Sequence, residues 1–216
     1  MPAARRTKQQ VVSEFRHAEI LAAARRVFAA RGYEGASVEE IARTAGVAKG
    51  TVYLYYRSKD EIYQAALREG LLALCAELRL RVQAARGVQD TIRAFVDTKL
   101  AHFEEHRDFL RIYVAAFGNL TPQPAAQREC RALYLEQLSL LEAGMRAALR
   151  HDRVRHVPAE AAALAVFDLT KGVVQRRLLG RSREATEKDV AFLLELLRKG
   201  LAQPALRPVR EQRRSV

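Results

Sequence analysis

The sequence predicts an all-α protein, with a small N-terminal helical domain followed by a larger helical domain. Its 216 residues lack tryptophan and include no alternating β-branched stretch long enough to predict a strand. Hydrophobic residues make up 49% of the chain, and the abundance of alanine, leucine, arginine and glutamate favours helices. We expect a flexible basic arm over 1–14, domains over 15–60 and 61–203, and a basic tail over 204–216.

Local signals divide the predicted N-terminal domain into short helices. Apolar residues from Ile20 to Phe28 recur at helical spacing, and Gly32 ends that helix. Ser37 and Ser58 each precede a glutamate by three residues, which is the spacing of a capping box. In this motif the serine caps the helix start, and the glutamate side chain reaches back to the cap residue. The predicted helices cover 15–31, 37–45, 48–56 and 58–84.

Long amphipathic segments follow in the larger domain. Prolines at 122, 124 and 158 mark two helix starts, because proline is tolerated in a first turn. The predicted helices cover 88–105, 107–118, 124–150, 159–180 and 184–202.

The charge of the chain favours a polyanionic partner. The net charge is +12, with eleven Lys or Arg and six acidic residues in residues 1–60. Nucleic acid is the first candidate for this partner, and an anionic membrane surface is the second. Cys75 and Cys130 lie far apart, each in an apolar stretch of sequence, so we expect buried thiols in a reducing compartment. No signal peptide or apolar run of membrane-spanning length is evident, and a cytoplasmic protein is expected.

One segment has the pattern of a helix-turn-helix, namely SVEEIARTAGVAKGTVYLYY at 37–56. Ala42 is small enough for two helices to cross closely, and Gly46 can adopt the backbone angle of the turn. The second helix is short and rich in hydroxyl and basic groups, which suits the major groove and nearby phosphates. Its outer-face residues are Lys49, Gly50, Thr51, Tyr53, Tyr55 and Lys59.

The stretch from Ile20 to Leu67 resembles the N-terminal domain of TetR-type regulators along its whole length. The matching features include Phe28, Gly32, Ala45-Gly46-Val47 and Lys49-Gly50-Thr51. This resemblance implies double-stranded operator DNA as a partner. It assigns phosphate contacts to Ser37, Thr51, Tyr53 and Lys59, and positions in or beside the major groove to Lys49, Gly50 and Tyr55.

The sequence departs from the commonest family pattern at two positions. Ala48 stands where a serine often caps the second helix, so that cap is missing. Tyr56 stands where phenylalanine is common, and we expect a core residue with its hydroxyl at the edge. Leu54 occupies a variable, groove-facing position, where it can contact only a thymine methyl group.

The resemblance also implies that the larger domain binds an effector and forms a homodimer. The helices near 159–180 and 184–202 are expected to pair with their mates in a second chain, on a palindromic operator. The family default is a repressor released by a small hydrophobic or amphipathic molecule, with the helix from Ser58 transmitting the change. Candidate pocket residues are Phe95, Phe103, Phe109, Tyr113, Phe117, Tyr134, Leu138 and Phe167.

Other functions receive less support from the sequence. His102 and His106 are four residues apart, as zinc ligands on a helix can be, but Phe103 replaces the glutamate of the zincin motif and no third ligand is evident. No phosphate loop, nucleophile elbow or paired-cysteine motif occurs, so neither an enzyme nor a cofactor is expected. A DNA-binding protein without an effector and a membrane-surface protein stay open as alternatives.

Overall fold

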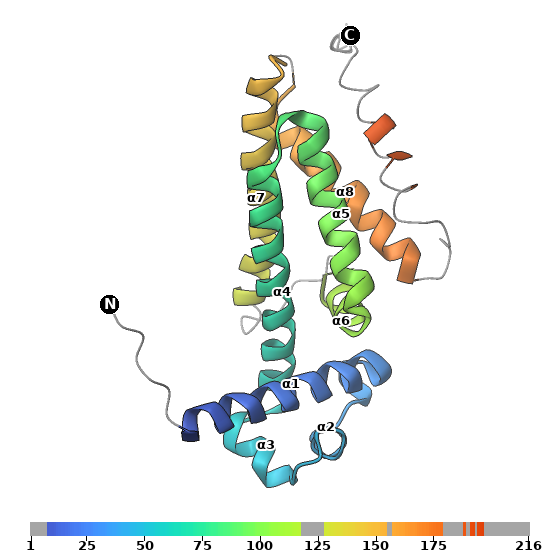
Figure 1. Cartoon of the computed structure of the whole chain (residues 1–216). Helices are drawn as coiled ribbons and strands as arrows, with labels where there is room; N and C mark the ends of the chain where they lie inside the picture. Colours follow the sequence, from blue (N-terminus) through green and yellow to red (C-terminus); the bar gives the residue numbers. More distant parts are fainter. Residues whose placement is uncertain are drawn as a thin grey trace, which may run out of the picture.

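The computed structural model of the chain describes residues 8–117, 128–154, 157–178, 188, 191–192 and 194–196. Every regular element in this part of the chain is a helix, as the sequence predicts (Figure 1). The helices are α1 (Lys8–Gly35), α2 (Val38–Ala45), α3 (Lys49–Tyr55), α4 (Lys59–Ala84), α5 (Gly87–Glu105), α6 (Arg107–Phe117), α7 (Arg128–His151) and α8 (Ala159–Leu178). None of the described helices is long and apolar enough to cross a lipid bilayer.

Helix α1 begins earlier than the sequence predicts. It starts at Lys8, so residues 8–14, which were expected to belong to a flexible arm, are helical. The helical geometry is interrupted at Gly32, where φ is 70° and ψ is 175°. Residues with a side chain rarely adopt such a positive φ, which explains why the chain turns at this glycine.

The later boundaries differ less from the prediction. Helix α7 is described from Arg128 onward, and the predicted start near residue 124 falls within 118–127, which lie outside the described residues. Most of the predicted helix at 184–202, and all of the predicted tail at 204–216, also lie outside them.

Both predicted serine caps are present, and the two glutamates differ in their contacts. Ser37 Oγ accepts a hydrogen bond from the Glu40 amide, and Ser58 Oγ accepts one from the Glu61 amide, each at 3.1 Å. The Glu61 carboxylate reaches back to the amide of Arg57 at 2.6 Å. The Glu40 carboxylate instead lies 3.3 Å from Nε of Arg31, so its expected return to the cap is replaced by an ion pair between α2 and α1.

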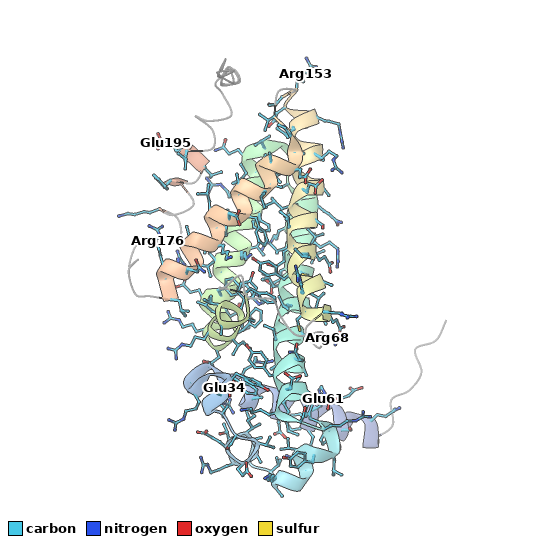
Figure 2. All side chains as sticks on the ribbon, turned by 180° about the vertical axis from the view of Figure 1, so that it is seen from behind. Glu34, Glu61, Arg68, Arg153, Arg176 and Glu195 are labelled. Atoms are coloured by element: carbon cyan, nitrogen blue, oxygen red, sulfur yellow. The ribbon has the colours of Figure 1, made fainter. Side chains whose placement is uncertain are left out.

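The helices place the predicted helix-turn-helix at one end of an elongated molecule. Figure 1 shows α2 and α3 below α1, and α4 running from this end along α7. Helices α5 and α8 pack with α7, and α6 packs on α1. From behind, Figure 2 shows Glu34 and Glu61 toward the α1–α3 end and Arg153 at the opposite end.

A close contact between α4 and α6 fixes the position of α6, which also packs on α1. A side-chain carbon built at Gly70 in α4 would lie 2.3 Å from Cδ2 of Phe109 in α6. The Phe109 ring, only 2% exposed, therefore occupies space that any other residue at position 70 would need.

The substitution Gly70→Ala is expected to destabilise the protein by about 1–3 kcal/mol, because the Phe109 ring must move to admit a methyl group. Gly172→Ala in α8 is the matched control, since nothing lies within 4 Å of the added carbon there. Thermal unfolding of both variants checks this. An equal midpoint in the two variants would contradict the assigned contact.

Candidate functional site

The turn between α2 and α3 has the geometry that the sequence predicts. Gly46 adopts the left-handed conformation, with φ of 69° and ψ of 29°, and the amide of Val47 donates to the carbonyl of Ala42 at 3.0 Å. Val52 on the inner face of α3 is fully buried. Ala48 begins α3 without a side-chain cap, as expected. The inner face of α3 is thus fixed against the core, which leaves its outer face accessible.

That outer face presents three side chains of different chemistry. Lys49 and Tyr53 are exposed, and the Lys49 ammonium lies 5.8 Å from the centre of the Tyr53 ring. Leu54 is 83% exposed. Gly50 is also exposed, with nothing within 4 Å of the space a side chain would take. Cationic, hydroxyl and apolar groups therefore share one short, protruding helix.

Lys49 has an acidic neighbour on α2. Its ammonium donates to Oε1 of Glu39, and this hydrogen bond lowers the pKa of the Glu39 carboxyl and raises the pKa of Lys49. Both side chains are well exposed, so the ion pair is weak and screened by salt. A phosphate or a base edge would compete with Glu39 for this lysine.

Lys59 has different neighbours from those that the resemblance implies. Its Nζ donates to the carbonyls of Tyr33, Glu34 and Ala36, at 2.9, 3.4 and 3.2 Å, and lies 4.5 Å from the centre of the Tyr33 ring. An ammonium has three hydrogens, and three carbonyls are within reach of them. In this structure Lys59 therefore stabilises the C-terminal end of α1 and the residue that follows it, and a phosphate contact would require it to leave a carbonyl.

The remaining predicted residues of this region either already make a contact within the chain or are partly buried. Ser37 is exposed, but its hydroxyl already caps α2, while Thr51 and Tyr55 are half-buried. Tyr56 is 4% exposed and its hydroxyl lies 2.8 Å from Nε2 of His17, which agrees with the predicted core position. Burial raises the pKa of Tyr56, so the phenol keeps its proton.

The predicted pocket residues gather in one aromatic cluster between α5, α6, α7 and α8. Ring centres are 4.8 Å apart for Phe103 and Tyr113, and 5.4 Å apart for Tyr134 and Phe167. Phe117 stacks on Tyr134 with ring centres 4.4 Å apart. The cluster consists of Phe95, Phe103, Phe109, Tyr113, Phe117, Tyr134 and Phe167, and Leu138 packs against the same core.

The rings fill most of the space between them. A cavity of about 10 Å³ remains, and Tyr113, Phe117 and Tyr134 line it together with residues of α5 and α8. Such a volume holds about one water molecule. The other five predicted residues are core side chains outside the lining of this cavity, so the predicted pocket is closed in this structure.

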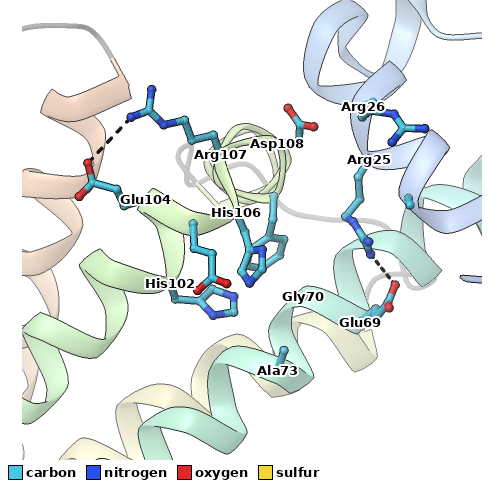
Figure 3. A pocket seen from close by; sticks show the side chains of 13 residues that line it. Arg25, Arg26, Glu69, Gly70, Ala73, His102, Glu104, His106, Arg107 and Asp108 are labelled. Carbon is cyan, nitrogen blue, oxygen red and sulfur yellow. Dashed lines mark hydrogen bonds and ion pairs between the residues drawn. The ribbon is translucent and has the colours of Figure 1, made fainter. Parts of the chain in front are cut away.

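A larger, more polar cleft of about 630 Å³ lies where α1, α4, α5 and α6 meet (Figure 3). Nη1 of Arg25 lies 2.5 Å from Oε2 of Glu69 across it. Phe109 is the one predicted pocket residue that also lines this cleft. The cleft therefore lies between α1 and the helices of the larger domain.

The two histidines singled out in the sequence lie on this cleft. His102 is 2% exposed, its Nδ1 lies 3.0 Å from Oε1 of Glu77, and its ring centre is 4.6 Å from that of His106. Burial lowers the pKa of His102, and the hydrogen bond with Glu77 opposes this effect. Among the described residues, no group of three His, Cys, Asp or Glu side chains is placed to hold a metal ion.

Lys99 is a residue of the cluster that the sequence interpretation missed. It is 1% exposed and lies between Phe95 and Phe103, four residues from each, so all three share one face of α5. A lysine at the centre of an aromatic helix face is the signal that could have identified it, because lysine is almost never fully buried without a partner.

Comparison with known proteins identifies the N-terminal region. Residues 20–66 match the family model for bacterial regulatory proteins of the tetR family. The match covers the second half of α1, all of α2 and α3, and the start of α4. It therefore includes the exposed face of α3.

Relatives extend the similarity along the chain. The transcriptional repressor AcnR of Corynebacterium efficiens is 26% identical over 191 residues, which are 86% of this chain and 92% of that protein. The transcriptional activator FasR of Mycolicibacterium smegmatis is 32% identical over 112 residues, 52% of this chain and 51% of that protein. The solved structure of FadR from Bacillus subtilis in complex with stearoyl-CoA has a TM-score of 0.73 and 18% identity, covering 84% and 97% of the two chains.

The substitution Lys59→Met is expected to lower the stability of the DNA-free protein by about 1–3 kcal/mol, because three carbonyls lose their charged donor. Lys49→Met is the comparison, since its exposed ion pair leaves the unfolding midpoint unchanged. Chemical denaturation in the absence of DNA measures both. Equal unfolding midpoints for the two variants would show that Lys59 does not stabilise the DNA-free protein. Phosphate binding would then be its only expected role.

Proposed function

This chain belongs to the TetR family of bacterial regulatory proteins, and we propose that it is a ligand-responsive repressor. As a homodimer it binds a palindromic operator through α3. A small hydrophobic or amphipathic molecule, bound in the larger domain, releases it from DNA. The proposed domains are the helix-turn-helix domain over 15–60 and the effector-binding and dimerisation domain over 61–203.

The exposed face of α3 is the observation that carries the proposed DNA binding. Leu54 is 83% exposed on α3, the same short helix that carries the exposed Lys49 and Tyr53, so its side chain is available to an apolar partner outside the chain. The major groove supplies thymine methyl groups for Leu54 and acceptors on guanine for a lysine. A helix with these three groups can therefore contact base edges and the flanking phosphates together.

The other proposed contacts follow from the positions of the residues. Thr51, Tyr53 and Ser37 supply hydroxyl groups to phosphates, and Gly50 lets the backbone of α3 approach the groove. Tyr55 is half-buried, which favours a place beside the groove rather than within it. Lys59 joins the phosphate contacts only when it releases one of its carbonyls.

The exposed apolar side chains of α8 support the proposed dimer. Leu164, Leu169 and Leu178 are 47%, 36% and 38% exposed, and farther along the chain Phe192 and Leu196 are 64% and 48% exposed. Exposed large apolar side chains are candidates for protein contacts. A two-fold symmetric pairing of this region in two chains would place two copies of α3 on the half-sites of a palindrome.

The proposed effector site is the aromatic cluster, and α6 offers a route from it to DNA. Phe109, Tyr113 and Phe117 of α6 belong to the cluster, while Nη1 of Arg111 on the same helix donates to the carbonyl of Ala29 in α1 at 3.4 Å. Helix α4 provides a second route, since it packs on α1 as well as on α5 and α7. A ligand that moves these rings would therefore alter the support of the helix-turn-helix.

The substitution Lys49→Ala is expected to weaken binding to a selected operator by about tenfold and to reduce its salt dependence, because one cationic contact is lost. Arg153→Ala is the control, as Arg153 lies at the opposite end of the molecule. Fluorescence anisotropy with labelled operator DNA at several salt concentrations measures both. If Lys49→Ala left the operator affinity and its salt dependence unchanged, the assignment of α3 as the DNA-binding helix would be refuted.

The substitution Leu164→Glu is expected to convert a dimer into a monomer, because it places a charge within an apolar interface. Leu135→Glu in α7 is a matched control, since Leu135 is also 47% exposed. Light scattering of the purified proteins gives their masses. A monomeric unsubstituted protein, or equal dissociation of both variants, would contradict the interface on α8.

A further inference from the structure

A buried cation lies within the aromatic cluster without an anionic partner. The Nζ of Lys99 is 4.4 Å from the ring centre of Phe167, and 5.5 Å from those of Phe95 and Tyr113. Within the described residues, its ammonium has no hydrogen-bond acceptor and no carboxylate within ion-pair distance. The rings attract a cation through their faces, but they do not neutralise its charge.

A second polar group in the same core also lacks a partner. Gln137 of α7 is fully buried, and its Oε1 accepts a hydrogen bond from the Tyr113 hydroxyl at 3.4 Å. Its Nε2 has no acceptor among the described residues. The core around Tyr113 therefore contains two donors, on Lys99 and Gln137, that an external acceptor could satisfy.

A purely structural role does not account for Lys99. A buried group without a partner costs free energy, and methionine or leucine would fill the same space without that cost. Lys59 shows the contrasting case, because its ammonium is surrounded by three carbonyls. The aromatic contacts of Lys99 hold its ammonium beside the small cavity, where a ligand atom would meet it.

We propose that Lys99 binds the carboxylate of a ligand whose remaining body is apolar. This inference rests on the proposed effector site and specifies the class of its ligand. A single buried cation is balanced by a single negative charge, which favours a monocarboxylate over a dianion. Tyr113, Phe117, Tyr134, Val114 and Val174 supply the aromatic and aliphatic wall for the apolar body, and Lys171 and Gln175 complete the polar side.

Ligand entry requires the cluster to open. The cavity of about 10 Å³ is too small for a carboxylate with a hydrocarbon body, so side chains that line it must move. Phe117 and Tyr134, which stack on each other at the cavity, are the side chains whose separation would enlarge it. Because Phe117 belongs to α6, its displacement acts on the helix that contacts α1.

Binding of decanoate and of decanol to the full-length protein tests the proposal. The two probes share an apolar chain and differ in the anionic group. The unsubstituted protein is expected to bind decanoate at least about tenfold more tightly than decanol, and Lys99→Met is expected to abolish this preference while it retains decanol binding. Lys171→Met is the control, because Lys171 is a half-buried lysine at the same cavity. This variant is expected to lose less of the preference for decanoate over decanol than Lys99→Met does.

Three results would overturn the proposal. They are equal decanoate affinity in the unsubstituted and Lys99→Met proteins, binding of decanol alone, and binding of neither probe. Decanoyl-coenzyme A, in which the carboxyl group is a neutral thioester, is a third probe. If it binds tightly and independently of Lys99 while decanoate does not bind, the anionic contacts lie elsewhere and the proposal is also wrong.

Two further measurements on Lys99→Met distinguish a failure of this proposal from misfolding of the variant and from a failure of the proposed function. Lys99→Met is expected to unfold at a higher temperature than the unsubstituted protein in the absence of ligand, because a buried charge is removed. Its operator binding without ligand is expected to be unchanged. If DNA binding responds to decanol but not to decanoate, the proposed response to a ligand is supported. The proposal that the ligand is a carboxylate is then refuted.

Proton uptake gives an independent readout of Lys99. Burial lowers its pKa to about 7, whereas Cys75 of α4 and Tyr134 of α7 have pKa values raised to about 11 and 12. The pKa of Tyr113 in α6 is also raised, and Lys171 of α8 lines the same cavity. Decanoate binding at pH 7 is therefore expected to take up about half a proton through Lys99. Calorimetry in buffers of different ionisation enthalpy measures this uptake, and its persistence in Lys99→Met would contradict the assignment.

Discussion

Helix α6 joins the two parts of this molecule, because its Phe109 packs against the backbone of α4 and the helix also packs on α1. The ring occupies the space beside Gly70 and also contacts Phe103 and Tyr113 in the aromatic cluster. Helix α6 therefore belongs to the core of the larger domain, while Arg111 on the same helix reaches the carbonyl of Ala29 in α1. Because close-packed interiors transmit displacements, the position of α6 constrains the helix that supports α2 and α3.

Three lysines show how the environment decides the role of one residue type. Lys49 remains in water beside the exposed carboxylate of Glu39, so an external anion can compete for it. Lys59 donates to backbone carbonyls at the end of α1 and just beyond it, so its charge stabilises that end of the helix. Lys99 is enclosed by rings and lacks an acceptor in the described residues. Burial and available acceptors, rather than net charge, separate these roles.

The sequence predicts the local features of this fold well. The caps at Ser37 and Ser58 and the left-handed Gly46 depend on residues within a few positions, so their signals are local. The start of α1 at Lys8 was missed because residues 8–14 have no apolar period. The acceptors of Lys59 are 23 to 26 residues away in the chain. Such contacts depend on tertiary packing, as does the filling of the predicted pocket by its own rings.

The closed cluster also determines how a ligand could act on DNA binding. A ligand shifts an equilibrium only by its difference in affinity for two states, and a cavity of about 10 Å³ excludes an amphipathic molecule from the closed state. Binding energy is therefore available only to an open state in which Phe117 and Tyr134 separate. In the proposed open state Lys99 would gain a counter-ion and α6 would lose part of its packing. The anion that stabilises the open pocket would thus weaken the support that α6 gives to α1.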